Sequence, residues 1–251
     1  SSEGSSDFVT ANVTGTISSS GVDLNASSLS VNANSVTANA NANNGINKLA
    51  VTASSMNQAT LGLSSLQGNS NANVLANAQG NIFANFDTVS AGNVSVNNNE
   101  VKSTAIANTA SNGVNLSVTN TTGSTVAPAM QAVGTVTSDN IVDLQAAADV
   151  MVSNYQAFLI GTVKAETGSL GTASTVGLTV TDLDPGSAAT LNGNSLTSSA
   201  YANSASNTST VRATNLDGMA YATANLQKAQ TATVVANTYG SVLADTPYVT
   251  N

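Results

Sequence analysis

The chain has 251 residues, of which 13 are acidic and 5 basic, and it contains neither His nor Cys. The five basic residues are scattered singly and the net charge is −8, so no basic stripe could neutralise phosphates, which argues against nucleic acid or an anionic membrane as a partner. The usual nucleophile and base pairs, disulfides and Cys-based metal sites are excluded, and no catalytic motif is present, so we expect no enzymatic activity and no cofactor.

The remaining composition predicts a folded protein with a thin core. Hydrophobic residues make up 41% of the chain and charged residues only 7%, whereas disordered chains combine low hydrophobicity with high net charge. Only 4% of residues are aromatic, so the core must be built from Ala, Val, Ile and Leu. The sequence contains no apolar run long enough to insert into a membrane. We expect an extracellular or cell-surface protein in its mature form, after removal of a leader.

The N-terminal segment, residues 1–20, is expected to be extended, because apolar and polar residues alternate over much of residues 9–17. One face carries Val9, Ala11, Val13 and Ile17. The simplest interpretation is the first strand of the fold. The alternative is an assembly arm that pairs with the open edge of another subunit, where backbone bonds give affinity and alternate side chains fill pockets.

A recurring pattern of Asn and small residues follows this segment. The stretch NSVTANANANNGIN, residues 34–47, aligns without gaps on residues 99–112 and 194–207. The shared Asn positions are Asn34, Asn43, Asn47, Asn99, Asn108, Asn112, Asn194, Asn203 and Asn207, and a weaker copy adds Asn77 and Asn81. The Ala-Asn pairs of the copies are separated by 31, 34, 31, 95 and 34 residues. Because 95 is close to three times 32, the series indicates a repeat of about 32 residues with two degenerate copies in the middle, a length typical of repeat architectures.

Within each copy the side chains alternate with a period of two, which is typical of half-buried strands. In the first copy, one face is expected to carry Val36, Ala38, Ala40 and Ala42, and the other Thr37, Asn39, Asn41 and Asn43. The methyl face would form the core and the amide face a ladder of stacked Asn side chains. The pairs Asn44-Gly45, Asn112-Gly113 and Asn192-Gly193 are expected to be tight turns between strands.

Two later regions differ from the repeats. Residues 138–164 are poor in Asn and Gly and are expected to form a hydrophobic insert. The spacing of its apolar residues fits one face of a helix and one face of a strand equally well, and the β pattern of the surrounding sequence favours a strand. Asp182 and Asp184 are weak candidates for binding Ca²⁺, although a turn at Asp184-Pro185-Gly186 explains them more simply. The acidic residues Asp139, Asp143 and Asp149 form a similarly weak ligand set and are expected to be solvated.

These patterns predict a single all-β body over residues 1–251, with little or no helix. Either a β-solenoid with a repeat of about 32 residues or an elongated β-sandwich would fit the alternation.

The Asn template and its turns resemble the Asn/Ala/Gly-rich repeats of secreted bacterial matrix fibres, the functional amyloids and holdfast-type surface anchors. The region 138–164 and the absence of Gln from the repeats depart from the curli pattern. The resemblance implies a secreted structural subunit that polymerises with copies of itself by β-strand addition, anchored to a cell surface or to polysaccharide. The alternative is a secreted adhesin or binding module that recognises carbohydrate or ice.

Overall fold

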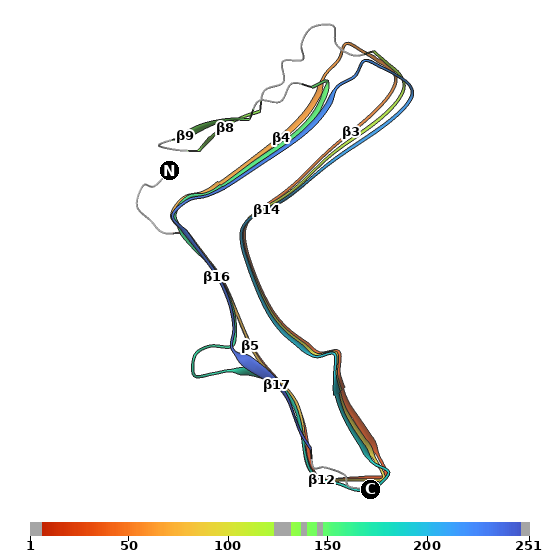
Figure 1. Cartoon of the computed structure of the whole chain (residues 1–251), viewed down its shortest axis with the longest axis vertical. Coiled ribbons are helices and arrows are strands. Elements are labelled where there is room, and N and C mark those ends of the chain that lie inside the picture. Colours follow the sequence, from red (N-terminus) through yellow and green to blue (C-terminus); the bar gives the residue numbers. More distant parts are fainter. Residues whose placement is uncertain (1–6, 123–131, 137–139, 145–147, 247–251) are drawn as a thin grey trace.

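The computed structural model describes residues 7–122, 132–136, 140–144 and 148–246. All regular elements in these residues are strands, and nearly all of them pair in parallel as successive coils of a β-solenoid, which confirms the expected all-β class (Figure 1). No helix in this part of the chain is long and apolar enough to cross a membrane.

The described residues run through three coils and begin a fourth. The first coil contains β1 (Asp7–Asn25), β2 (Ser28–Asn32), β3 (Ser35–Asn57) and β4 (Leu61–Asn69). The second contains β5 (Ala72–Ser90), β6 (Asn93–Asn97), β7 (Glu100–Thr122) and β10 (Val150–Phe158). The third contains β11 (Gly161–Thr167), β12 (Ser174–Leu183), β13 (Ala188–Asn192), β14 (Ser195–Asp217) and β15 (Tyr221–Ala229). The fourth begins with β16 (Ala232–Thr238) and β17 (Gly240–Asp245).

Each residue of a coil lies beside its counterpart in the next coil, so that equivalent residues form columns along the axis. One column contains Val9, Val74, Val163 and Val234, and the neighbouring inward column contains Ala11, Ala76, Ala165 and Ala236. Partners in the first two coils are 65 residues apart. The first coil is therefore 65 residues long, about twice the spacing of 32 residues read from the sequence. Each of the first two coils contributes two copies of the pattern, one to each of its long walls, whereas the third has Glu166 in place of the Asn on the β5 side. The 95 residues between Asn108 and Asn203 are one coil lengthened by loops, so the prediction of two degenerate copies between them is wrong.

The two walls enclose two hydrophobic cores. One wall is formed by β3, β7 and β14, and the other by the strands of the β5 and β10 sheets (Figure 1). The larger core lies between β5, β7 and their neighbours and includes Val74, Ile82, Val101 and Phe86. The smaller core, around Leu116 and Val150, lies between β7 and β10. Val and Ala dominate the larger core and Val the smaller one, in keeping with the composition, and these small side chains let the walls approach closely.

The corners of the coils are made by residues with positive φ. One corner column contains Ala33, Asn98 and Gly193, with φ angles of 56°, 56° and 65°, so the expected Asn192-Gly193 turn is present. The turns expected at Asn44-Gly45 and Asn112-Gly113 are wrong, because both pairs lie inside the 23-residue strands β3 and β7. Parallel pairing of β7 with β3 and β14 along its length holds these residues extended and overrides their turn preference.

Much of the region predicted as an insert belongs to the solenoid. The preference for strand over helix is confirmed where it is described: β9 (Asn140–Leu144), β10 and β11 are all strands. β10 pairs with β4 and β15, so it is a regular wall of the coil. The additional residues of the second coil lie between β7 and β10, where β8 (Ala132–Val136) and β9 form an antiparallel pair that joins none of the parallel sheets but contacts β4 and β10.

Two glycines, Gly193 at a corner and Gly113 inside β7, allow the corner assignment to be tested. A Cβ on Gly193 would lie 2.3 Å from Oδ1 of Asn98, at a positive φ, whereas a Cβ on Gly113 would meet nothing within 4 Å. We expect G193A to lower the free energy of unfolding by about 2 kcal/mol, because it combines a left-handed Ala with a steric clash. G113A should leave it unchanged or slightly raised. Equal urea midpoints for the two variants would contradict the corner assignment.

Candidate functional site: amide columns that end at open strand edges

Nine of the Asn residues singled out from the sequence lie in three columns along the solenoid axis. Asn34 Nδ2 donates to Asn99 Oδ1 at 3.0 Å, and Asn99 Nδ2 donates to Asn194 Oδ1 at 2.9 Å. The second column joins Asn43, Asn108 and Asn203 at 2.9 and 2.8 Å, and the third joins Asn47, Asn112 and Asn207 at 2.9 and 3.0 Å. The sequence template therefore aligned residues that stack on one another, and within one chain these ladders run across all three coils.

The second and third columns point into the solenoid, which corrects the predicted division of the strand into two faces. Buried positions alternate up to Ala107, and then Ala107 and Asn108 are buried in succession, after which the alternation continues in the opposite phase. Asn39 stays on the exposed face, whereas Asn43 and Asn47 face inward. A local bend in the wall reverses the inward face. The ladder and the methyl groups therefore both face the interior of the solenoid, from opposite faces of the same strand.

The inward amides form a polar layer between the two hydrophobic cores, here called the amide belt. It consists of Asn43, Asn47, Gln67, Asn69, Asn108, Asn112, Asn154, Gln156, Asn203, Asn207, Asn225 and Gln227. Asn108, Asn112, Asn154 and Gln156 are at most 2% exposed. A buried amide without partners would be costly, so its stability depends on complete hydrogen bonding.

Bonds across the belt connect the two walls. Asn108 Nδ2 on β7 donates to the carbonyl of Ala157 on β10 at 3.0 Å. In the opposite direction, Gln67 on β4 donates to the carbonyl of Thr109 at 2.8 Å. One amide hydrogen of Asn108 thus crosses the interior while the other continues the column to Asn203, so the belt sets both the separation of the walls and the register of the coils.

Sequence reasoning missed a Gln column in the same belt. Gln156 Nε2 donates to Gln67 Oε1 at 2.7 Å, and Gln227 Nε2 donates to Gln156 Oε1 at 3.0 Å. Gln67 and Gln156 are 89 residues apart in the sequence, because the second coil contains the β8–β9 insertion. Gln156 and Gln227 are 71 residues apart, because the third coil contains a short loop after β11. The unequal spacings concealed the column, and aligning whole coils with gaps at those two loops would have revealed it.

Asn77 and Asn81 form no comparable ladder. The Asn77 column contains Asn12, Glu166 and Asn237, and Asn237 Nδ2 donates to Glu166 Oε1 at 3.4 Å. Asn81 is flanked by Thr16 and Thr175. Both belong to β5, where the inward positions are the apolar residues between them, so the amides lie on the outer face of the wall.

The residues expected in an assembly arm lie in the first strand of the first coil. Val9, Ala11, Val13 and Ile17 stack on Val74, Ala76, Ala78 and Ile82 of β5. Val9, Ala11 and Ile17 pack against the larger core, and Val13 is 37% exposed because no coil covers β1 on its other side in the described part. The arm is therefore folded back along its own chain in this structure.

The acidic candidates contribute to turns and corners. Asp184 begins a turn in which Ser187 N donates to its carbonyl at 3.0 Å, and the hydroxyl of Ser90 donates to its carboxylate. Asp182 is exposed, and the described residues hold no cluster of three or more His, Cys, Asp or Glu that could bind a metal. Asp139 and the side chain of Asp143 lie outside the described residues.

Asp149 is not solvated, contrary to expectation. It is 2% exposed and accepts a hydrogen bond from Ala220 N at 2.8 Å at the start of β10. Burial raises the pKa of the nearby Tyr221 hydroxyl, and the Asp149 carboxylate raises that pKa further. The two side chains thus belong to a corner of the coil and not to a metal site.

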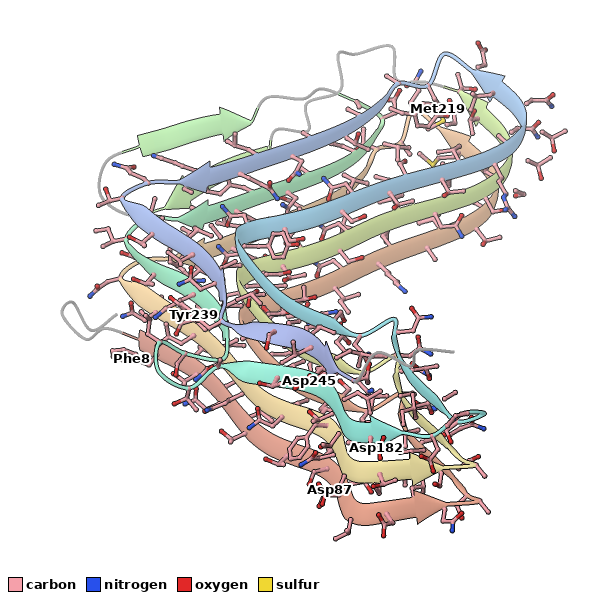
Figure 2. The ribbon with its side chains drawn as sticks, turned by 60° about the horizontal axis from the view of Figure 1, so that its bottom comes forward. Phe8, Asp87, Asp182, Met219, Tyr239 and Asp245 are labelled. Carbon is pink, nitrogen blue, oxygen red and sulfur yellow. The ribbon has the colours of Figure 1, made fainter. Side chains whose placement is uncertain are left out.

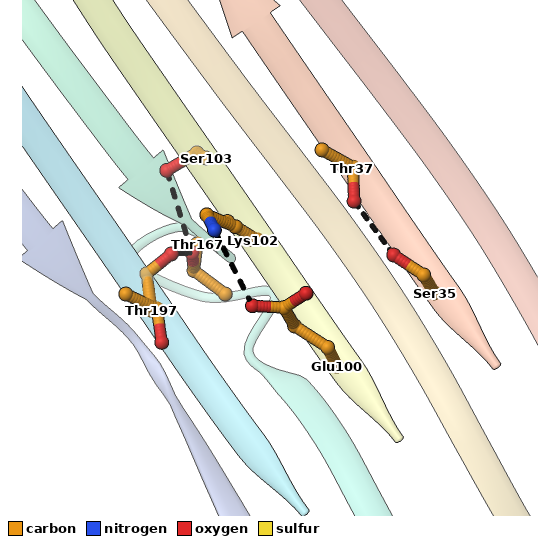
Figure 3. A network of polar contacts seen from close by, with 7 residues as sticks. All are labelled: Ser35, Thr37, Glu100, Lys102, Ser103, Thr167 and Thr197. Atoms are coloured by element: carbon orange, nitrogen blue, oxygen red, sulfur yellow. Dashed lines mark hydrogen bonds and ion pairs between the residues drawn. The ribbon is translucent and has the colours of Figure 1, made fainter. Parts of the chain in front are cut away.

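A second polar contact joins the walls beside the larger core. Ser103 on β7 and Thr167 on β11 are both fully buried, and their hydroxyls are 3.4 Å apart (Figure 3). Thr167 also donates to the carbonyl of Thr197 at 2.7 Å. The outer face has different chemistry, because Lys102 and Glu100 pair there at 3.7 Å with both side chains about two-fifths exposed.

Both ends of the stack present strand edges without partners among the described residues. Figure 2 shows the layers of the β5 wall in order, from Phe8 in β1 through Asp87 and Asp182 to Asp245 in β17. On the opposite wall the outermost strands are β3 and β14. These edges, with the amide columns that end at them, are the strongest candidate for a functional site in the described structure.

No family model, curated protein or solved structure matches the chain.

The contribution of the belt can be measured at its most connected residue. Truncation in N108A leaves the carbonyl of Ala157 and the amides of Asn43 and Asn203 without their buried partner, so we expect the free energy of unfolding to fall by about 3 kcal/mol. N115A is the matched control, because Asn115 lies on the exposed face of the same strand. If urea unfolding gave equal losses for the two variants, the belt would not stabilise the walls.

Proposed function

We propose that this chain is a structural subunit of an extracellular filament or biofilm-matrix fibre, which assembles by adding the strand edges of one copy to those of the next. This proposal is based on one observation, that the amide columns end at long strand edges that have no partner among the described residues. β3 and β14 each expose an edge of 23 residues, and three Asn columns run from one edge to the other. Soluble monomers usually blunt such edges, because an unpaired strand templates pairing with another chain.

The polarity of the Asn columns supports head-to-tail association. In every bond along these columns an amide hydrogen of one coil is donated to Oδ1 of the following coil. Oδ1 of Asn34, Asn43 and Asn47 therefore faces the first edge without a donor among the described residues. At the other edge, Asn194, Asn203 and Asn207 each donate one amide hydrogen to a backbone carbonyl and retain a second one.

The composition is consistent with this role. With 7% charged residues, few like charges oppose contact between copies, and the low aromatic content suits an interior of stacked small side chains and amides. An oxidising compartment is compatible with the chain, because it has no Cys to oxidise.

Two lysine substitutions on β14 test the assembly. Ala205 faces inward in the column of Gly45 and Ala110, and Ser206 faces outward beside it. A205K places an inward charge at the edge, a device that prevents edge pairing, so light scattering and electron microscopy should show folded monomers. S206K makes the same charge change on the outer face and should still give fibres. If the unmodified chain stays monomeric at high concentration, or if A205K polymerises like S206K, assembly through this edge is wrong.

A second candidate function is favoured by the outer face of the β3 wall. A depression of about 350 Å³ lies over Gly113, which has no side chain to fill it. Its rim carries Lys48, Ser111, Asn115 and Thr208, all exposed. Rows of hydroxyl and amide groups beside one cation could bind the hydroxyl and acidic groups of a polysaccharide.

This candidate can be tested separately from assembly, because the depression lies on the outer face. We expect the chain to sediment with an insoluble polysaccharide such as cellulose or chitin, or to bind soluble alginate. A G113Q/T208Q variant, which fills the depression, should lower the retained fraction at least tenfold, while T119Q on the same strand should not. Equal retention of both variants would remove this second function.

A further inference from the structure

The first described strand, β1, and the last two, β16 and β17, correspond to the same part of the coil. β1 contains Val9, Ala11, Asn12, Gly15 and Ile17, and β16 with β17 contains Val234, Ala236, Asn237, Gly240 and Val242 at the corresponding places. Between them, β5 has Val74, Ala76, Asn77, Gly80 and Ile82 in the same columns. Either end segment therefore presents the same inward side chains to a β5 surface.

The two walls contain different numbers of layers. On the β5 wall the described strands make four layers: β1, β5, β11 with β12, and β16 with β17. On the opposite wall they make three, β3, β7 and β14. Among the described strands, one end of the stack is therefore a step, in which β16 and β17, the start of a fourth coil, project one layer beyond β14.

Simple stacking of two intact copies does not fill this step. If β1 of a second copy lay on β16–β17 of the first, one layer would be missing between β14 and the second copy's β3. The spacing of neighbouring strands is about 4.8 Å, so these two strands would be twice that distance apart and could not hydrogen-bond. Only the short strands β16 and β17 would gain partners.

We propose that copies of this chain join by strand replacement, in which β16–β17 of one copy occupy the place of β1 in the next copy, against its β5. This inference rests on the proposed filament function and specifies its mechanism. With β1 displaced at the Ala26 corner, β14 of the first copy lies directly beside β3 of the second, and the solenoid continues without a missing layer. The step at one end then matches the position that β1 leaves.

The exchange gains more pairing than it loses. The displaced β1 is a strand of 19 residues, whereas the new contact between β14 and β3 joins two strands of 23 residues. β13 and β15 also gain partners in β2 and β4, which are their counterparts in the coil. The lost contacts of β1 with β5 are largely restored, because β16–β17 bring the same Val, Ala and Gly positions.

The amide columns give an independent reason for this arrangement. When β14 and β3 are adjacent, the remaining amide hydrogens of Asn194, Asn203 and Asn207 face the open Oδ1 atoms of Asn34, Asn43 and Asn47. The Gln column runs in the opposite sense, so Gln67 of one copy would donate to Gln227 of the other. Donors meet acceptors in all four columns only if no layer is missing between the copies.

Engineered disulfides can distinguish replacement from simple stacking, because the chain has no Cys of its own. Thr16, Asn81, Thr175 and Ser241 form one outward column. Asn81 and Ser241 are two layers apart within a chain, too far for a disulfide, but one layer apart between copies if β1 is replaced. Thr16 and Ser241 become neighbours only if β1 stays in place.

We expect N81C/S241C in the full chain to form disulfide-linked oligomers under mild oxidation, seen on a non-reducing gel, whereas T16C/S241C stays monomeric on the gel. A50C/T210C should also cross-link between copies, because Ala50 and Thr210 are two layers apart in the chain and adjacent across the new interface.

Fibres in which T16C/S241C cross-links and N81C/S241C does not would overturn strand replacement and leave the filament proposal intact. Fibres in which none of the three Cys pairs cross-links would also overturn strand replacement and leave the filament proposal intact. A chain that forms neither fibres nor cross-links at high concentration would overturn both proposals.

Discussion

In-register parallel stacking is the constraint on which the rest of this structure depends. Each side chain has its counterpart from the neighbouring coil about 4.8 Å away, so a position must suit the same chemistry repeated along the axis. Small apolar residues satisfy this requirement by packing, as in the columns of Val74 and Ala76. Amides satisfy this requirement by donating and accepting hydrogen bonds along the axis. The second amide hydrogen then remains available to bond the opposite wall, as in Asn108.

The sequence allows the all-β class, the period of two and three amide columns to be predicted, because stacking repeats the same residue types at equivalent positions. The template at residues 34–47, 99–112 and 194–207 records this repetition directly. The bend that turns Asn43 and Asn108 inward could not be predicted, because it depends on the facing wall, whose carbonyl at Ala157 accepts the amide. The repeat length read from the sequence is half that of the first coil for a related reason. The two walls of one coil have similar composition, so copies from opposite walls appear in the sequence as one series.

A solenoid made in this way has two different ends even though its middle is repetitive. The direction of the bonds in the three Asn columns distinguishes them, since these columns present oxygens at one end and hydrogens at the other, and the Gln column does the reverse. β16 and β17 add a difference in shape, because with them the described strands stack one layer higher on the β5 side than on the β3 side. Chemistry and shape thus distinguish the same two ends, which favours a polar assembly with a single repeating contact over a symmetric pair.

The thin core has a thermal consequence. Unfolding of most domains exposes much apolar surface, and the resulting large heat-capacity change makes their stability strongly dependent on temperature. Here the buried side chains are mainly Val and Ala, with amides between the cores, and exposure of polar groups offsets part of that heat-capacity change. The stability of this solenoid should therefore vary less between cold and warm surroundings than that of a domain of equal length with a core of Leu and Phe.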